Sequence, residues 1–479
     1  MQPRLRFAPS PTGNLHIGSV RTAIFNWVWA KKLGAALVLR IEDTDLERST
    51  QAFEQNIFEG LDWLGIHFDE SPMQPAGSML YRQSERIHAN VYNKYLKTLI
   101  DNGDAYYCFE TDEELELERQ AAEEKGEAYM YSRRSLQYTP EEVAEKLASG
   151  IPWTIRFKVP DDQTLVMKDV IRGDISFEAN LISDFIIVKS DGNPTYNFAV
   201  VIDDYEMGIT HVVRGEDHIS NTPKQMMIFQ ALGWEVPIFA HLPIILGSDR
   251  SKLSKRHGAK SVSEYRDEGF LPHALINYLS LLGWSPPEGK ELLSLDELND
   301  LFNVERINKA GAVFDTVKLT WMNKQYLSQL SDAEFLNVAM SYLSDESKAL
   351  VDRDKKILSI RDNVDVLSNT DVYLEVYRLS TEGYFEKYKE LSMADSDFAV
   401  LRFAQAEITK TDEWSPSFVD ELIGRIMKEL SLGRGKVMKP LRKGLTGYES
   451  GPNLADCLAL IPQQEILNRL EKVLNYVNS

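Results

Sequence analysis

The first 41 residues carry the pattern that most limits what this chain can fold into. The stretch from Arg4 to Gly18 reads as a short strand, a tight loop of prolines and glycines, and the start of a helix. An apolar stripe with helical spacing supports that helix, and its members are Val20, Ala23, Ile24, Trp27 and Val28. Gly34 ends the helix, and residues 35–41 form an apolar run suited to a buried parallel strand. The chain therefore begins with a strand–helix–strand unit, whose helix N-terminus favours a bound phosphate.

The loop of this unit matches neither G-x-G-x-x-G nor G-x-x-x-x-G-K-[ST], the two common phosphate-binding fingerprints. It offers an imidazole instead, because His16 stands two residues before Gly18. A histidine there can donate a hydrogen bond to a phosphoryl oxygen as negative charge develops on it. By itself a His-x-Gly tripeptide is common by chance, so this loop needs a second feature to support it.

A second loop, residues 247–258, follows the apolar run 242–246 and supplies that feature. It carries four basic residues interleaved with serines and bounded by glycines: Arg250, Lys252, Lys255 and Arg256. Lysines act as mobile positive charges on phosphates. Taken alone, the loop could equally be an ordinary solvated basic loop.

The two loops together resemble the paired ATP-binding motifs of class I aminoacyl-tRNA synthetases, with His-Ile-Gly at 16–18 and Lys-Leu-Ser-Lys at 252–255. The resemblance is to the bacterial glutamyl-tRNA synthetase family. It extends over further motifs at residues 8–13, 40–45, 213–218 and 305–311. Residues 4–325 carry it strongly, and the remainder matches by length and helical character. Where glutaminyl relatives usually have Pro-Glu-Pro-Asn-Gly, this chain has Pro-Ser-Pro-Thr-Gly at 9–13.

The segment pattern fits the order of domains that the resemblance implies. Strand and helix patterns alternate up to residue 98, are interrupted, and resume before a mostly helical remainder. The implied fold is an α/β Rossmann-like catalytic domain, split as 1–98 and 190–246. An α/β insertion at 99–189 would bind the acceptor end of tRNA. A stem-contact region at 247–327 would carry the lysine loop, and an all-helical region at 328–479 would bind the anticodon.

Local patterns also predict particular elements within these segments. Thr222 is expected to cap a helix that has Pro223 at its first position. Residues 242–246 are expected to form one buried strand. Trp321 is expected to pack at a domain joint.

The resemblance also implies a reaction and a set of site residues. Glutamate attacks the α-phosphorus of ATP, and a ribose hydroxyl at the tRNA 3′ end then attacks the glutamyl-adenylate. Such steps need positioning and charge stabilisation rather than a protein nucleophile. The implied catalytic residues are His16, Lys252 and Lys255, and the ATP site comprises His16, Gly18, Lys252, Leu253, Ser254 and Lys255. The implied glutamate pocket comprises Arg6, Ala8, Ser10, Glu42, Tyr196 and Arg214.

Physical chemistry supports the two arginines most directly. Both Arg6 and Arg214 fall at the ends of predicted strands, where ligands bind in open α/β sheets, and a guanidinium matches a carboxylate. A glutamine amide in place of the glutamate carboxylate would leave one of these cations underpaired. Other roles remain open. Arg214 could pair with the acids at 216–217, Glu42 could be a structural acid beside Arg40, and Tyr196 could be a core residue.

Composition limits the remaining classes. The chain has no run of apolar residues long enough for a membrane span and no secretory leader pattern. Its two cysteines, Cys108 and Cys457, lie far apart, which fits a reducing cytoplasm. A net charge of −20 opposes a nucleic-acid partner in general, but residues 431–443 are basic and contain no acid. We expect RNA to be admitted only along such stripes, and the acid-rich run 110–127 to be a solvated helix face.

Cofactors and partners follow from the same resemblance. We expect ATP with Mg²⁺, L-glutamate, tRNA for glutamate, and tRNA for glutamine as a second candidate, in a monomer. Many relatives carry a zinc knuckle in the insertion, but Cys108 alone cannot build one, so no zinc and no protein metal site are expected. In the anticodon region, Asn363 aligns loosely with a position that reads a base in some relatives, with Arg361 nearby.

Three other functions compete with this interpretation. A small-molecule nucleotidyltransferase would be much shorter, and a tRNA-base glutamylating enzyme would lack the helical region. A non-catalytic descendant would be expected to lose His16 or the lysines, which this chain keeps.

Overall fold

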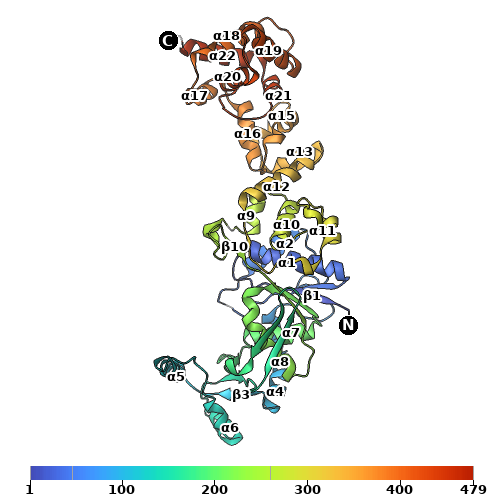
Figure 1. The fold of residues 1–479 in the computed structure, drawn as a ribbon, viewed down its shortest axis with the longest axis vertical. Helices are drawn as coiled ribbons and strands as arrows, with labels where there is room; N and C mark the ends of the chain where they lie inside the picture. Colours follow the sequence, from blue (N-terminus) through green and yellow to red (C-terminus); the bar gives the residue numbers. More distant parts are fainter. Residues whose placement is uncertain (1, 46, 259, 478–479) are drawn as a thin grey trace. The chain divides into compact units, whose positions relative to one another are not determined.

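The computed structural model describes residues 2–45, 47–258 and 260–477 (Figure 1). The chain divides into two units, residues 1–264 with 276–315 and residues 265–275 with 316–479. The first is an α/β unit built on a mostly parallel sheet, and the elements described in the second are helices. This agrees with the predicted α/β catalytic part followed by a helical region.

A six-stranded sheet forms the centre of the α/β unit. Its strand order is β2 (Ala36–Leu39), β1 (Arg4–Phe7), β8 (His211–Gly215), β9 (Ile238–Leu242), β5 (Thr164–Asp169) and β6 (Gly173–Glu178). All neighbours are parallel except β5 and β6, which form an antiparallel hairpin. Strands β5 and β6 come from segment 99–189, so this segment adds an edge to the same sheet as β1.

Helix α1 (Ile17–Leu33) connects β1 to β2 and confirms the predicted strand–helix–strand unit. The predicted apolar stripe is buried, and the apolar residues on its other sides, Phe25 and Trp29, are buried as well. Gly34 ends the helix in the left-handed conformation, with φ at 60°, and its N–H donates to the carbonyls of Ala30 and Lys31. The apolar stripe therefore predicted the position of the helix correctly, but more of the helix surface is buried than the stripe indicated.

Further helices complete the α/β unit. They are α2 (Gln51–Trp63), α3 (Gln83–His88), α4 (Asn93–Asp101), α7 (Tyr196–Glu206), α8 (Thr222–Ala231) and α11 (Leu295–Leu301). Helices α9 (Val262–Asp267) and α10 (Pro272–Leu281) lie where the chain passes between the two units. The core of this unit includes Val38 of β2, Phe198 and Val201 of α7, and Val212 of β8.

A smaller antiparallel sheet is formed by strands that lie in the sequence between β2 and β8, as β5 and β6 do. Its order is β3 (Ala105–Cys108), β4 (Thr154–Phe157) and β7 (Phe185–Val188). Helices α5 (Asp112–Glu124) and α6 (Pro140–Ala148) accompany it (Figure 1). Leu115 is the buried residue of α5, and it packs with Cys108 and Tyr131. Most of the other α5 residues are exposed, as its acidic sequence predicted.

Two local predictions are wrong. The expected strand 242–246 is divided, because β9 ends at Leu242 and the separate strand β10 (Ile245–Leu246) pairs with β11 (Ala312–Val313). Pro243 lies between them and has no N–H to donate to a sheet. Thr222 does not cap α8, because a 3-10 helix at Glu216–Asn221 runs directly into α8 and places Thr222 in helical backbone.

The helical unit contains α12 (Thr316–Gln329), α13 (Asp332–Ala339), α14 (Asp345–Lys348), α15 (Arg353–Ile360), α16 (Asn369–Arg378), α17 (Thr381–Lys389), α18 (Asp395–Ile408), α19 (Pro416–Glu429), α20 (Arg434–Thr446), α21 (Leu454–Ala459) and α22 (Gln463–Val477). One apolar cluster includes Leu327, Phe335 and Ile357, and a second includes Leu401 and Ile423. The helices therefore pack around two successive cores.

Two residues of the helical unit that the sequence singled out have clear surroundings. Trp321, expected to pack at a domain joint, is 43% exposed, while its neighbour Met322 is buried. Arg361 instead has a structural role at the end of α12. Its guanidinium pairs with Asp332 at 2.8 Å and donates to the carbonyls of Leu327 and Ser328.

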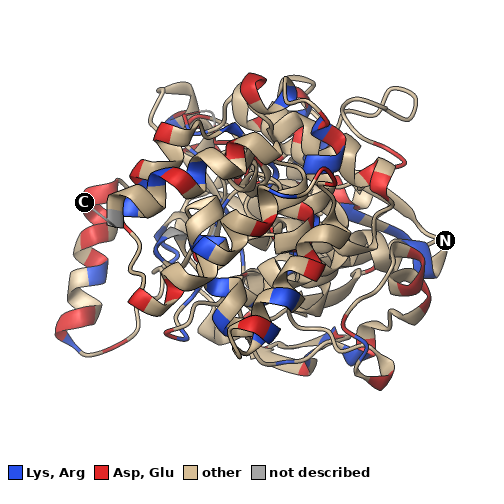
Figure 2. Ribbon diagram, turned by 90° about the horizontal axis from the view of Figure 1, so that it is seen from above, with Lys and Arg blue, Asp and Glu red and all other residues tan. Residues whose placement is uncertain are grey.

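Acidic and basic side chains are interspersed along the helices (Figure 2). In the basic stretch 431–443, Arg434 at the start of α20 pairs with Asp420, and Lys443 in its last turn pairs with Glu449. Lys436 and Lys439 of the same helix are exposed. Within the described ranges, no helix is both long and apolar enough to cross a membrane.

Candidate active site

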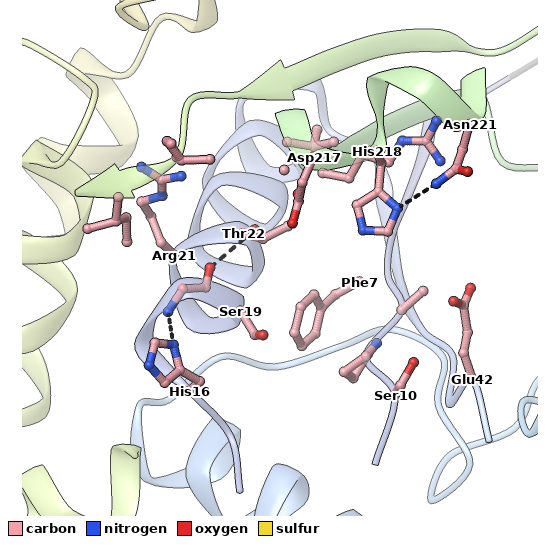
Figure 3. A pocket seen from close by; sticks show the side chains of 18 of the residues that line it. Phe7, Ser10, His16, Ser19, Arg21, Thr22, Glu42, Asp217, His218 and Asn221 are labelled. Carbon is pink, nitrogen blue, oxygen red and sulfur yellow. Dashed lines mark hydrogen bonds between the residues drawn. The ribbon is translucent and has the colours of Figure 1, made fainter. Parts of the chain in front are cut away.

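A cavity of about 590 Å³ opens at the carboxyl ends of β1 and β8, beside the start of α1 (Figure 3). Because β2 and β8 flank β1 on opposite sides, this edge is a switch point of the sheet, the usual ligand position in open α/β folds. The predicted residues in its wall are Arg6, Ala8, Ser10, His16, Gly18, Glu42, Tyr196, Arg214, Lys252 and Leu253. The fold thus brings together residues that lie more than 240 positions apart in the sequence, from Arg6 to Lys252.

His16 caps the N-terminus of α1. Its Nδ1 accepts a hydrogen bond from the Gly18 N–H at 3.1 Å, drawn as a dashed line in Figure 3. Because Nδ1 accepts, the neutral ring carries its proton on Nε2, which can donate to a ligand oxygen. A Cβ at residue 18 would lie 3.4 Å from Nδ1, so glycine keeps this contact uncrowded. The first turn of α1 holds no acid, which leaves the helix N-terminus attractive to phosphate.

The basic loop reaches the cavity through Lys252, whose Nζ lies 2.9 Å from the Asp217 carboxylate. Ser254 lies behind the wall, where its amide N–H donates to His257 Nδ1 at 3.2 Å. Lys255 begins a short 3-10 helix, and its side chain falls outside the described part of the structure. A Cβ on Gly247 would lie 2.6 Å from the His257 ring, so this glycine lets the loop fold tightly on itself. Sequence reasoning missed the role of His257.

Arg6 connects the cavity wall to a buried network of charges behind it. Its guanidinium pairs with Asp204 of α7 at 3.2 Å, and Asp204 also pairs with Arg40 at 2.7 Å. Burial opposes ionisation of Asp204, but the two arginines outweigh it and hold the pKa of this carboxyl below its usual range. Arg40 is fully buried and also pairs with Glu42 at 2.9 Å. Glu42 therefore has both properties that the sequence left open, a structural ion pair and a place in the cavity wall.

Arg214 has different partners. Its Nε donates to His241 Nε2 at 3.1 Å, and its Nη2 donates to the Thr222 hydroxyl at 2.8 Å. Among the described residues it makes no ion pair, and its buried Nη1 has no hydrogen-bond partner. The alternative pairing with residues 216–217 is wrong, because Glu216 pairs with Arg172 and Asp217 pairs with Lys252. Burial lowers the pKa of Arg214, as expected for a cation without a counter-ion.

Tyr196 begins α7 and contributes to the wall rather than only to the core. Its hydroxyl lies 3.2 Å from His218 Nδ1. Burial, followed by the nearby charge of Arg214, lowers the pKa of His218 to about 4, so this imidazole is neutral near pH 7. Sequence reasoning gave no site role to Asp204, His218, His241 or Thr222, although residue 218 lies in a quoted motif and Thr222 was expected to cap a helix. A pair of aspartates within the apolar helix α7 was the one available signal for Asp204.

The surroundings of Cys108 bear on the expected absence of zinc. The thiol donates to Glu110 at 2.8 Å, and Glu110 also accepts from the hydroxyls of Tyr131 and Ser135. Arg156 Nε donates to the sulfur at 3.4 Å. In the described residues, no group of three or more His, Cys, Asp or Glu side chains could hold a metal. The absence of zinc itself stays a prediction.

Comparison with known proteins agrees with this site. The family described as tRNA synthetases class I (E and Q), catalytic domain, matches residues 2–321, and an anticodon binding domain matches residues 320–474. This chain therefore belongs to the class I tRNA synthetases of the glutamate and glutamine group.

Individual relatives are similar over their full length. A glutamate–tRNA ligase from Aquifex aeolicus is 46% identical, with 98% of each chain covered. One from Carboxydothermus hydrogenoformans is 44% identical, covering 98% of this chain and all of the relative. A solved glutamate tRNA ligase from Elizabethkingia meningosepticum, in complex with its amino acid, superposes with a TM-score of 0.87 at 35% identity, covering 99% of each chain.

Proposed function

We propose that this chain is a glutamate–tRNA ligase that activates L-glutamate with ATP and transfers it to the 3′ end of tRNA for glutamate. In the first step a glutamate carboxylate oxygen bonds to the α-phosphorus of ATP, and pyrophosphate leaves. In the second step a terminal ribose hydroxyl of tRNA attacks the acyl carbon, and AMP leaves. The observation that carries this proposal is the cavity itself, where two buried arginines share one space with a histidine-capped helix N-terminus.

The ATP phosphates would lie at the start of α1. There the backbone around Gly18 and the Nε2–H of His16 can donate to phosphate oxygens. Lys252 and Lys255 would stabilise the charge that develops on the leaving pyrophosphate. Leu253 and Ser254 would complete this loop. The Lys252 contact with Asp217 is a solvent-exposed pair, so phosphate can compete for the lysine at little cost.

Mg²⁺ would accompany ATP and neutralise part of the phosphate charge. The acids of the cavity wall, Glu42 and Asp217, already have cationic partners in Arg40 and Lys252. Phosphate oxygens and waters would therefore supply most of its ligands, as Mg²⁺ commonly prefers.

Glutamate would occupy the inner part of the cavity. Arg6 and Arg214 would bind its carboxylates, and Glu42 would attract its ammonium group. Ala8, Ser10 and Tyr196 would complete the pocket. The charge of Arg214 is the feature that favours a carboxylate over an amide, because a glutamine side chain would leave the guanidinium without a counter-ion.

The tRNA would contact several segments in the order that the sequence suggests. Residues 99–189 would bind the acceptor end, residues 247–327 the stem, and residues 328–479 the anticodon, around a catalytic domain at 1–98 and 190–246. We propose a monomer that works in the cytoplasm, where reduced Cys108 and Cys457 are stable.

The direct test is ATP-dependent attachment of labelled glutamate to purified tRNA for glutamate and, separately, to tRNA for glutamine. Charging of the first alone defines a discriminating enzyme, and charging of both a non-discriminating one. The variant His16→Ala is the control for the site and should lose adenylate formation while retaining tRNA binding. Charging of neither tRNA in the presence of Mg²⁺ would reject the proposal.

A further inference from the structure

Behind Arg214, and outside the cavity wall, lies a fully buried group of polar side chains that the proposed reaction does not use. His241 of β9 and Asp169 of β5 both have no solvent-exposed side-chain surface. His241 Nδ1 lies 2.7 Å from Asp169 Oδ2, and the His241 backbone N–H donates to the same oxygen at 3.0 Å. At the opposite edge of the imidazole, His241 Nε2 lies 3.1 Å from Arg214 Nε.

These contacts determine the tautomer of His241. An arginine Nε always carries a proton, so Nε2 must be the acceptor and the single proton of the neutral ring must be on Nδ1. The Asp169 carboxylate accepts that proton's hydrogen bond. Its other oxygen, Oδ1, accepts from the backbone N–H groups of Ile171 and Arg172 at 2.9 and 2.7 Å. Both oxygens of Asp169 accept hydrogen bonds from N–H groups, which is the arrangement expected for an ionised carboxylate.

The arrangement holds a guanidinium without neutralising it. Its two occupied nitrogens donate to an imidazole and a hydroxyl, both uncharged, while Nη1 remains buried without a partner. A carboxylate in place of His241 would fix Arg214 equally well but would cancel its charge. A neutral acceptor fixes the orientation and leaves the full positive charge for a ligand.

We propose that His241 and Asp169 are positioning residues that hold the Arg214 guanidinium in the cavity wall and thereby set the preference for a glutamate carboxylate over a glutamine amide. The inference rests on the proposed function, because it takes the Arg214 ligand to be the amino-acid substrate. Asp169 ends β5, which the sequence places in segment 99–189. The orientation of Arg214 therefore depends on the segment proposed to bind the acceptor end of tRNA.

The central experiment replaces His241 with two amides of different reach in the full-length chain. In His241→Asn the amide can keep the contact to Asp169 but cannot reach Arg214, whereas in His241→Gln an oxygen can occupy the place of Nε2. We expect the Asn variant to raise the KM for glutamate about tenfold or more, the scale of a lost hydrogen bond to a charged group. The KM for ATP should stay within about twofold, and the Gln variant should recover most of the loss. The preference for glutamate over glutamine in kcat/KM should fall in parallel with glutamate KM.

Asp169→Asn tests the tautomer. The introduced amide has one oxygen and one NH2 group. Its oxygen should stay opposite the two backbone N–H donors, so its NH2 group faces His241 Nδ1. The ring is then expected to move its proton to Nε2, so that Nδ1 can accept. That proton would oppose Arg214 Nε, and glutamate KM should rise as in His241→Asn. In histidine ¹⁵N spectra, Nδ1 of His241 should be protonated in the wild type and Nε2 in Asp169→Asn, with the signal assigned by its loss in His241→Asn.

Control variants separate positioning from general damage. His211→Asn removes another partly buried imidazole from the same strand as Arg214, and it should leave glutamate KM unchanged. The inference is overturned if His241→Asn keeps the wild-type glutamate KM. It is also overturned if glutamate and ATP KM rise together with a lower melting temperature, or if His241→Gln is as impaired as His241→Asn.

The outcome for the proposed function is separate. A wild-type chain that charges no tRNA rejects the function, and glutamate titrated into the ¹⁵N-labelled protein then decides the inference alone. A shift of the His241 Nε2 signal on glutamate addition supports the Arg214 contact, and an unmoved signal at saturating glutamate overturns it.

Discussion

Arg6 and Arg214 lie near the carboxyl ends of two neighbouring parallel strands, yet their charges are compensated in opposite ways. Arg6 shares the Asp204 carboxylate with Arg40. Arg214 is held by an imidazole and a hydroxyl, and none of the described carboxylates pairs with it. The comparison separates two tasks in one cavity. The Arg6 side is a balanced ionic network that contributes to the fold, whereas the Arg214 side retains an uncompensated cation for a ligand.

Such a difference has an energetic consequence. A buried ion pair is tolerated because each charge offsets the desolvation of the other, and removing one partner is strongly unfavourable. A buried cation without a counter-ion is unfavourable in the free protein and is compensated only when an anion binds. Stability and ligand affinity should therefore respond oppositely to changes on the two sides.

The largest effect is expected from Asp204→Asn. This change leaves Arg6 without its carboxylate in a buried site and should lower the unfolding free energy of the α/β unit by about 3–5 kcal/mol. The measurement is the urea midpoint followed by a probe in that unit. Asp101→Asn, at a solvent-exposed pair with Lys97, is the control and should cost about 0.5 kcal/mol or less. Equal midpoints for the two variants would show that the Arg6 network does not stabilise the fold.

The second prediction contrasts the arginines directly. Arg214→Gln should weaken glutamate binding about a hundredfold, while the urea midpoint stays unchanged or rises because an unpaired buried charge is gone. Arg6→Gln should lower the midpoint, because Asp204 then keeps only Arg40. Glutamate titration and urea unfolding on the same two proteins give both quantities. A reversed order of the midpoints would break the comparison.

The third prediction concerns the pH dependence of stability, which should cover a different pH range on the Arg214 side than on the Arg6 side. Burial and Arg214 lower the pKa of His218 from 6.5 to about 4. Below about pH 6.5 this histidine is protonated in the unfolded chain but stays neutral in the folded chain. Its contribution to the free energy of unfolding is therefore complete above this pH and is lost as the pH falls toward 4. The loss should be on the order of 2 kcal/mol. On the Arg6 side, Asp204 has a lowered pKa, so its contribution persists until the pH falls below 3.8.

Urea midpoints between pH 7 and 4 for the wild type and His218→Gln test this window. The variant should show a weaker decline, with the remaining slope from other histidines of lowered pKa, such as His211 and His241. Identical slopes of midpoint against pH for the two proteins would show that His218 does not cause the loss of stability.

The smallest effect is expected from Thr222→Val. It removes the hydroxyl that accepts from Arg214 Nη2 but leaves the contact with His241, so glutamate affinity should fall by about 1 kcal/mol, roughly fivefold. Thr222→Ser keeps the hydroxyl and should behave as the wild type. A Val variant with unchanged glutamate affinity would show that His241 alone orients the guanidinium.

Much of the fold and the cavity wall could be predicted from sequence. Helix α1 followed from its apolar stripe and from Gly34. The wall residues His16, Gly18, Lys252 and Leu253 belong to two short motifs, whereas Glu42, Tyr196 and Arg214 were expected only from the family resemblance. The misplaced elements have local causes. The run 242–246 is apolar throughout, but Pro243 divides it, and Thr222 looks like a cap because the preceding 3-10 helix has no sequence signal.

The sequence by itself determined which chemical groups are available: a histidine before a helix glycine, a lysine loop, and an arginine at the end of each of two strands. Only the tertiary structure decided which arginine keeps its charge. Asp204 lies 198 residues from Arg6 along the chain, and Asp169 lies 72 residues from His241. These partners meet because β8, β9 and β5 are neighbours in the sheet, and because α7 brings Asp204 beside Arg6 of β1 and Arg40, which follows β2. Electrostatic pairing depends on distances of a few ångströms, and strand order sets those distances where local sequence pattern cannot.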